Sequence, residues 1–193
     1  FIMMKKVISI PEKPKAFKKQ FILELEKIGL QSIGIVLFIS FFVGGVVSIQ
    51  TALNLQNPLL PTYLIGLASR DSLILEFSPT MISLILAGKV GSSIASEIGS
   101  MRVSEQIDAL EIMGVNSASF LILPKIIASM FFFPCLVILS MAIGMIGAWI
   151  GGLSVNVTTT DFLYGLQYEF VPFYVTYAII KTLFFAFVVS SIS

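Results

Sequence analysis

The sequence "IIASMFFFPCLVILSMAIGMIGAWIGGLSVNVTTT", residues 126–160, contains no charged side chain. A helix needs about 20 mainly apolar residues to cross the hydrocarbon core of a bilayer, and this stretch is longer than that. A second uncharged stretch covers residues 29–69. Across all 193 residues, 56% are apolar and 12% are charged, and the mean hydropathy is +0.98. These values exclude an ordinary soluble domain and predict an all-α integral membrane protein.

Hydropathy predicts four membrane-spanning helices in a single transmembrane domain, residues 1–193, at about residues 28–53, 72–95, 118–150 and 171–193. The N-terminal region is rich in lysine, which places the N-terminus in the cytoplasm by the positive-inside rule. Counting spans from there, the loop 153–170 lies outside and the segment 97–116 lies inside. The loop 153–170 agrees, because it contains two acids and no Lys or Arg.

Residues from about 12 to 27 are predicted to form an interfacial amphipathic helix before the first span. Phe17, Phe21, Leu25 and Ile28 follow a helical spacing, and the lysines lie elsewhere around the helix. Such a helix would lie on an anionic membrane surface. The alternative is a basic flank that only sets the orientation of the chain.

Small residues form two rows along the predicted second span. The residues of each row are four apart, as in a GxxxG face, which lets another helix backbone approach closely. One row consists of Gly88, Ser92 and Ser96, and the other of Gly91, Ala95 and Gly99. Gly147 and Gly151 repeat the spacing in the third span. We expect close helix packing at these residues, either within this chain or across a dimer.

The segment "EIGSMRVSEQIDALEIMGVN", residues 97–116, places four acids and one base between two apolar spans. Ser104 is a candidate N-cap and Gly114 a candidate C-terminal residue, so a short amphipathic helix is predicted between them. Its acidic excess disfavours an anionic membrane surface and favours a protein partner. The alternative is a solvated loop helix without a partner.

The residues give no support for catalysis. The chain contains no His, which excludes imidazole metal sites and His-dependent triads. Cys135 is the single cysteine, so no internal disulfide is possible, and it is interpreted as a packing residue. "AGKVGSS" fails the phosphate-loop pattern, because Ser83 replaces the first glycine and Val90 follows the lysine. We expect no metal site, no cofactor in this chain and no enzymatic activity.

Among the charges within predicted spans, Glu76 and Lys181 are singled out. An ionisable residue in a span is a functional candidate, because burying it alone is costly. The two side chains could pair with each other, or each could reach water or a lipid head group. An apolar cavity between the first two spans would suit acyl chains. The candidate lining residues are Leu53, Asn54, Leu73 and Phe77.

The stretch "AGKVGSSIASEIGSMRVSEQIDALEIMGVN", residues 87–116, closely resembles the signature region of the permease subunits of MCE-associated lipid ABC transporters, the MlaE/YrbE family. The residues that carry the resemblance are Glu97, Ile98, Gly99, Met101, Arg102, Glu105, Gln106, Met113, Gly114, Val115 and Asn116. Further similarity lies in "LILEFSPTMISLILAGK", "IGAWIGG" and "IIKTLFFAFVV". The resemblance covers most of the chain from about residue 20 onward.

This resemblance implies a homodimer of permeases in the bacterial inner membrane, two cytoplasmic ATPase subunits that bind ATP and Mg, a periplasmic MCE protein, and phospholipid as the substrate. Residues 97–116 would be the region that couples the permease to the ATPase. The expected polar contacts are Arg102, Glu105, Gln106, Asp108 and Glu111, and the expected apolar anchors are Ile107, Leu110 and Met113.

Family members have a fifth span after the last apolar region of this chain. The chain begins with Phe1 and stops at Ser193 inside an apolar run, so we expect a fragment.

Two other classes of membrane protein stay open on the residues alone. An ion-gradient-driven secondary transporter would need acids near the membrane midplane and an internal repeat, and only Glu76 fits. A non-transporting membrane assembly factor would not need the small-residue rows. No nucleic acid is expected among the partners of this chain.

Overall fold

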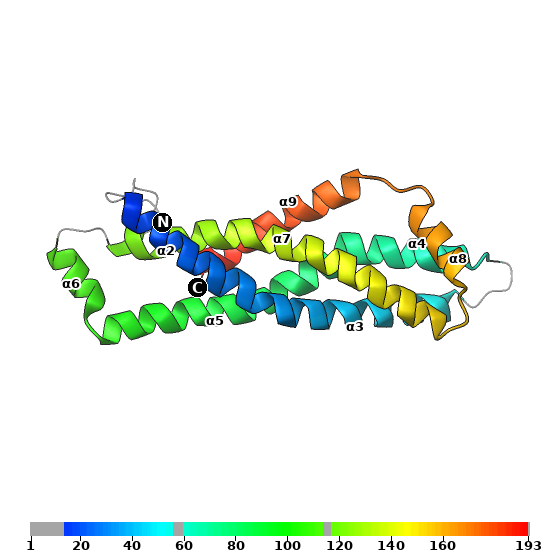
Figure 1. The fold of residues 1–193 in the computed structure, drawn as a ribbon, viewed down its shortest axis with the longest axis horizontal. Coiled ribbons are helices and arrows are strands. Elements are labelled where there is room, and N and C mark those ends of the chain that lie inside the picture. The colour runs from blue at the N-terminus through cyan, green and yellow to red at the C-terminus, as the bar shows by residue number, and fades with distance from the viewer. Residues whose placement is uncertain (1–13, 56–59, 114–116, 193) are drawn as a thin grey trace. The chain divides into compact units, whose positions relative to one another are not determined.

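The structure is a computed structural model that describes residues 14–55, 60–113 and 117–192, and these residues form helices and connecting turns without a strand (Figure 1). Four helical segments of this described part are long and apolar enough to cross a membrane. They are Gln20–Asn54, Tyr63–Val103, Phe120–Leu153 and Phe173–Ile192. The prediction of an all-α integral membrane protein with at least four spans is confirmed. The first two helical segments are much longer than their predicted spans, because the helical backbone continues into flanking segments that contain polar residues.

The N-terminal helix continues into the first span. Helix α2, Pro14–Leu25, leads through the π-helical turn η1, Glu26–Leu30, into α3, Gln31–Asn54. The interfacial helix predicted for residues 12–27 therefore has no break at its C-terminal end, and residues 12 and 13 lie outside the described residues. Short π-helical turns often occur at functional sites.

The second span also contains a π-helical segment. Helix α4, Tyr63–Ser72, is followed by η2, Leu73–Met81, and then by α5, Ile82–Val103. Pro79 lies inside η2. Proline has no N–H group and crowds the carbonyl of the preceding turn, so a departure from regular α-helix at this residue is expected.

The short helix after α5 begins later than predicted. Helix α6 covers Gln106–Ile112. The prediction that Ser104 caps this helix is wrong, because the Ser104 hydroxyl donates to the Ser100 carbonyl at 2.8 Å. Glu105 has a positive φ of 57° and turns the chain between α5 and α6. Gly114, the predicted C-terminal residue, lies outside the described residues.

The remaining helices are α7, Ser117–Leu153, α8, Thr159–Gln167, and α9, Phe173–Ile192. The chain divides into two compact units, and the long helices contribute to both. Unit 1 contains Phe1–Ser32, Ile85–Phe133 and Phe184–Ser193. Unit 2 contains Ile33–Leu84 and Pro134–Leu183.

In unit 2, glycines let the backbones of α3 and α7 touch. A Cβ atom on Gly44 would lie 1.9 Å from the Gly144 carbonyl oxygen, and a Cβ atom on Gly147 would lie 2.0 Å from the Phe41 carbonyl oxygen. Gly151 meets the backbone of Gly45 in the same way, at 2.6 Å. We call this contact between α3 and α7 the glycine seam. It contains Gly147 and Gly151, for which close packing was predicted.

The α3 side of the glycine seam is a row of small and buried residues that the sequence analysis missed. The residues recur every fourth position, which places them on one face of the helix. They are Val36, Ser40, Gly44, Ser48 and Ala52. The hydroxyl of Ser40 donates to the Val36 carbonyl at 2.6 Å and is hydrogen-bonded to the Ser140 hydroxyl of α7 at 2.8 Å. The repeat of small residues at this spacing was the available signal.

Helices α4 and α8 pack against each other at one end of unit 2. A Cβ atom on Gly165 would lie 2.2 Å from the Tyr63 carbonyl oxygen, so the two helices meet at their backbones. The Thr158 hydroxyl caps α8 by accepting from the Asp161 amide at 3.3 Å. Thr62 donates to the Asp161 carboxylate at 2.6 Å, and this hydrogen bond and a side-chain hydrogen bond with Thr158 hold the pKa of Asp161 below its usual value.

The C-terminal end of α8 is held by Arg70, which is buried. Its guanidinium donates to the carbonyls of Leu166 and Tyr168, at 2.9 and 2.8 Å, and pairs with Asp71 at 2.8 Å. Carbonyls at the end of a helix have no partner within the helix and carry partial negative charge, which a cation stabilises. Arg70 therefore has a structural role between α4 and α8.

Candidate functional site

The end of α5 and the helix α6 expose large apolar side chains. Val103 is 87% exposed, Ile112 is 88% exposed and Met113 is 68% exposed. Single exposed apolar side chains are common, but three on one short projecting segment are a feature of binding surfaces. We call residues 102–113 the coupling segment. Of these three apolar residues, only Met113 was among the predicted anchors.

The predicted polar residues of the coupling segment lie on its surface. Arg102 and Asp108 are brought together, with Arg102 Nη1 2.6 Å from Asp108 Oδ1, and both side chains are largely exposed. Glu105 and Gln106 are exposed as well. An exposed ion pair contributes about 1 kcal/mol or less, so a partner could rearrange it at little cost.

The other predicted residues of α6 are less exposed. Ile107 and Leu110 are half-buried, so they do not project as freely as Ile112 does. Glu111 lies on α6, and its side chain is outside the described part of the structure. Val103 and Ile112 were not among the predicted apolar anchors, although both are more exposed than Met113.

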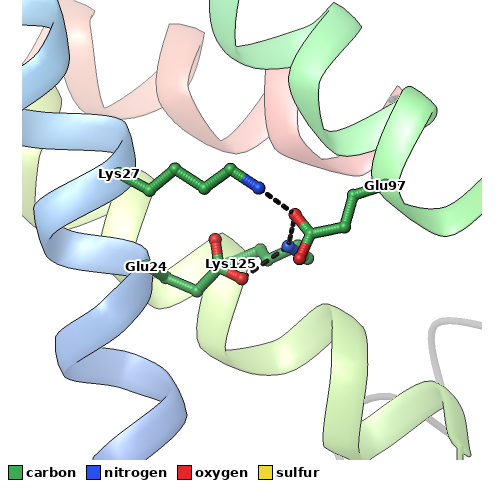
Figure 2. A network of polar contacts seen from close by, with 4 residues as sticks. All are labelled: Glu24, Lys27, Glu97 and Lys125. Carbon is green, nitrogen blue, oxygen red and sulfur yellow. Dashed lines mark hydrogen bonds and ion pairs between the residues drawn. The ribbon is translucent and has the colours of Figure 1, made fainter. Parts of the chain in front are cut away.

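A network of four charged residues joins three helical segments of unit 1 (Figure 2). Lys125 Nζ of α7 lies 2.5 Å from Glu24 Oε1 of α2 and 2.7 Å from Glu97 Oε2 of α5. Lys27 Nζ of η1 lies 2.7 Å from the same Glu97 oxygen. The Lys125 side chain is 1% exposed, whereas the Lys27 side chain is 42% exposed. We call these four residues the ion network.

No site role was predicted for Glu24, Lys27 or Lys125, and Glu97 belongs only to the residues that carry the family resemblance. Lys125 carried a signal, because it is the one charge inside the predicted third span and a buried cation needs a partner. The identity of that partner was not readable, because Glu24 is far away in the sequence.

Unit 2 contains an apolar cavity of about 450 Å³. Its lining comes from α3, from Ser72 at the end of α4 and from η2: Phe42, Val43, Val46, Val47, Gln50, Thr51, Ser72, Phe77 and Met81. Phe77 was predicted to line such a cavity. Leu53 and Asn54 are exposed and do not line it, and Leu73 is buried in the hydrophobic core of unit 2.

The two predicted intramembrane charges pair with each other in unit 2. Lys181 Nζ donates to Glu76 Oε2 at 2.9 Å and to the Leu75 carbonyl at 3.2 Å. Lys181 is mostly buried and Glu76 is mostly exposed. The pair satisfies the ammonium group of Lys181 and leaves one side of the Glu76 carboxylate open.

The small-residue rows of α5 are mainly on the surface of unit 1. Ser92, Ala95 and Ser96 are exposed, and a Cβ atom on Gly88 or Gly99 would meet no other atom within 4 Å. Gly91 is buried. Among the described residues, the predicted close approach of another helix is therefore seen at the glycine seam and not along this row.

No group of three or more His, Cys, Asp or Glu residues that could hold a metal ion occurs in the part of the chain that the structure describes. The lone cysteine, Cys135, is exposed. The described residues therefore present an exposed coupling segment, an apolar cavity, the ion network and the Glu76–Lys181 pair.

Comparison with known proteins gives matches over most of the chain. A family model described as "Permease MlaE" matches residues 21–193. A "Probable ABC transporter permease protein" of Rickettsia prowazekii is 32% identical over 187 residues, which cover 94% of this chain and 70% of that protein. The "Intermembrane phospholipid transport system permease protein MlaE" of Haemophilus influenzae is 32% identical over 153 residues, which cover 79% of this chain and 58% of that protein.

A plant protein is similar to the same extent. The chloroplastic protein "TRIGALACTOSYLDIACYLGLYCEROL 1" of Arabidopsis thaliana is 32% identical over 180 residues, which cover 88% of this chain and 49% of that protein. The family match over residues 21–193 extends over the described spans and the coupling segment.

Proposed function

The chain belongs to the MlaE permease family, and from this membership we propose that it is the membrane-spanning subunit of an ATP-driven transporter that moves phospholipids. The observation that carries the proposal is the family match over residues 21–193. In this function the chain does no chemistry itself. A partner ATPase binds ATP and Mg and hydrolyses the nucleotide, and the permease converts that work into lipid movement.

The coupling segment is the proposed contact with the ATPase. A groove on the ATPase would receive the exposed apolar side chains of Val103, Ile112 and Met113, and the charged residues around them would set the orientation. Buried apolar anchors surrounded by polar groups are the usual arrangement of a protein interface. The proposed location is a bacterial inner membrane. The N-terminus and the coupling segment would both face the cytoplasm, where the ATPase can reach the coupling segment.

A second copy of the chain is the proposed partner of the exposed face of α5. Ser92, Ala95, Ser96 and Gly99 present small side chains, so another helix could approach their backbone closely. A homodimer would place two coupling segments on two ATPase subunits. Nucleotide binding to the ATPases would shift the permease between two packing arrangements of its helices. The shift can be no larger than the difference in stability that the nucleotide gives to the two arrangements.

The cavity of unit 2 is the proposed site for acyl chains. Its lining is mainly apolar, with the polar side chains of Gln50, Thr51 and Ser72 at a few places, as in many ligand pockets. The Glu76–Lys181 pair is a proposed contact for a lipid head group, because Lys181 can exchange one anionic partner for another. An MCE protein on the other face of the membrane is the proposed donor or acceptor of the lipid.

Purification of the permease with its ATPase tests the proposal. Reversing two acids of the coupling segment, Glu105→Lys with Asp108→Lys, should lower the recovered ATPase about tenfold or more, because oppositely charged contacts become repulsive. Glu169→Lys is the matched control, because this acid is exposed but lies outside the coupling segment. Recovery of the ATPase at the wild-type ratio to permease in the double variant would refute the assigned contact.

Lipid movement between vesicles then tests the transport function. The complex should move phospholipid only with ATP, and a proton or sodium gradient should not replace the nucleotide. Movement driven by an ion gradient alone would favour a secondary transporter. A wild-type complex that moves no lipid under either condition would favour an assembly factor.

A further inference from the structure

The ion network ties the N-terminal helix to the helix that carries the coupling segment. Glu24 and Lys27 belong to α2 and η1, Glu97 to α5 and Lys125 to α7, and Figure 2 shows the four side chains converging between these helices. The four formal charges cancel, so the network as a whole is neutral. Acids and bases alternate along it, and each contact joins two different helical segments.

The two ends of the ion network differ in burial. The Lys125–Glu24 contact is almost completely buried. A buried ion pair is strongly favoured over either charge alone, because separation would leave a charge without solvent or partner. The Lys27–Glu97 contact is partly exposed, and water can replace either partner when the contact opens. The Lys125–Glu24 contact is therefore expected to stay closed, whereas the Lys27–Glu97 contact can open.

The releasable end lies close to the coupling segment along the chain. Glu97 and Val103 are on the same helix, separated by about 9 Å along its axis at the helical rise of 1.5 Å per residue. The turn of Ser104 and Glu105 then connects directly to α6. A displacement of α6 would reach Glu97 through this two-residue turn and the end of α5.

The other partner of this contact lies in the π-helical turn η1. Lys27 is within Glu26–Leu30, where the regular α-helical hydrogen-bond pattern is interrupted. Gly29, in the same turn, faces the Phe132 ring so closely that a Cβ atom would lie 2.1 Å from it. The turn is therefore both locally irregular and in tight contact with α7, and a change in the Lys27 contact would affect the helix on both sides of it.

We propose that the Lys27–Glu97 contact opens and closes during the transport cycle and passes the movement of the coupling segment to the N-terminal helix, while Lys125 keeps Glu24 and Glu97 joined. Lys27 is then a positioning residue for the coupling of ATP hydrolysis to lipid movement. This inference rests on the proposed function and adds the N-terminal helix to the moving parts.

The first test measures the number of lipids moved per ATP hydrolysed by the reconstituted permease–ATPase complex. Lys27→Met removes the charge and keeps the length of the side chain. We expect this variant to assemble and to hydrolyse ATP, and its ratio of lipid to ATP to fall about threefold, as for loss of a partly exposed ion pair. Lys27→Arg keeps the charge and should restore the ratio.

Glu26→Gln is the matched control, because Glu26 is an exposed charge in the same π-helical turn and is not part of the ion network. It should leave the ratio unchanged. The inference is overturned if Lys27→Met moves as much lipid per ATP as the wild type, or if Glu26→Gln lowers the ratio equally.

The second test does not depend on lipid movement. Hydrogen exchange of the backbone amides of residues 20–30 is measured in the complex without nucleotide and with trapped ATP. We expect ATP to change exchange there in the wild type and not in Lys27→Met. If the wild type moves no lipid with ATP, the proposed transport function fails, and exchange alone decides this inference. Exchange that ATP does not alter, or alters equally in both proteins, would overturn it.

Discussion

The two compact units of the chain hold their helices together by different means. In unit 1 the charged side chains of the ion network connect α2 and η1 with α5 and α7. In unit 2 the glycine seam brings the backbones of α3 and α7 into contact, with Gly44 against Gly144 and Gly151 against Gly45. Long charged side chains connect helices whose backbones are apart, whereas glycines allow the helix backbones to touch.

The two kinds of contact, ion pairs in unit 1 and glycine contacts in unit 2, differ in how much movement they allow. An ion pair between long side chains tolerates small shifts, because the side chains can change rotamer and water can enter. A backbone contact through glycine has no adjustable atoms, and interiors this closely packed resist deformation. We therefore expect unit 2 to behave as the rigid unit and unit 1 to carry the adjustable contacts.

The largest effect is expected from Lys125→Met in the ion network. The change leaves Glu24 buried without a partner, and breaking a buried pair costs about 3–5 kcal/mol. Unfolding of the detergent-purified permease by heat or denaturant should show this loss. The double change Lys125→Met with Glu24→Leu should recover most of it, because no unpaired charge remains. Stability of Lys125→Met equal to that of the wild type would show that the network does not join unit 1.

A smaller loss is expected from Gly44→Ala in the glycine seam. The new Cβ atom would clash with the Gly144 carbonyl and force α3 and α7 apart, at a cost of about 1–3 kcal/mol for an overpacked interior. Gly34→Ala on the same helix is the control, because its Cβ atom meets nothing within 4 Å. It should be neutral or slightly stabilising in the same unfolding measurement. Equal losses from both changes would contradict the seam.

Neighbouring residues of α5 allow the comparison to be made within unit 1. Ser92 is exposed and Gly91 is buried. Ser92→Leu should leave unfolding unchanged and weaken self-association about tenfold, as expected for a bulky residue in a small-residue contact between copies. Gly91→Leu should instead reduce folding yield. Light scattering measures the association, and a fully dimeric Ser92→Leu variant would exclude this face as the contact between copies.

A smaller loss of stability than that of Lys125→Met is expected from Lys181→Met in unit 2. Glu76 is mostly exposed, whereas Glu24 is buried, so the loss of Lys181 should cost less in the same unfolding assay than the loss of Lys125. The contrast with Lys125→Met sharpens the comparison, because the same substitution is made in a buried and in a partly exposed pair. A loss as large as that of Lys125→Met would show that Lys181 supports the fold of unit 2.

Several elements followed directly from the sequence. The four spans were predictable because hydropathy is averaged over neighbouring residues. The coupling segment was predictable because its charged residues lower the hydropathy between two spans. The first residue of α6 was not predictable, because the Ser104 hydroxyl donates to a carbonyl of α5 and the chain turns at Glu105. The π-helical turn η1 had no signal in the sequence, whereas Pro79 marks the departure from regular α-helix at η2.

The sequence by itself determined the helical class, the membrane environment and the membership in the family, because each depends on local composition or on a contiguous motif. Only the tertiary structure decided which charges pair and which small residues are covered. Lys125 and Glu24 are 101 positions apart, and Ser40 and Ser140 are 100 apart. No local pattern selects such partners, because pairing is settled by which faces the packed helices present to each other.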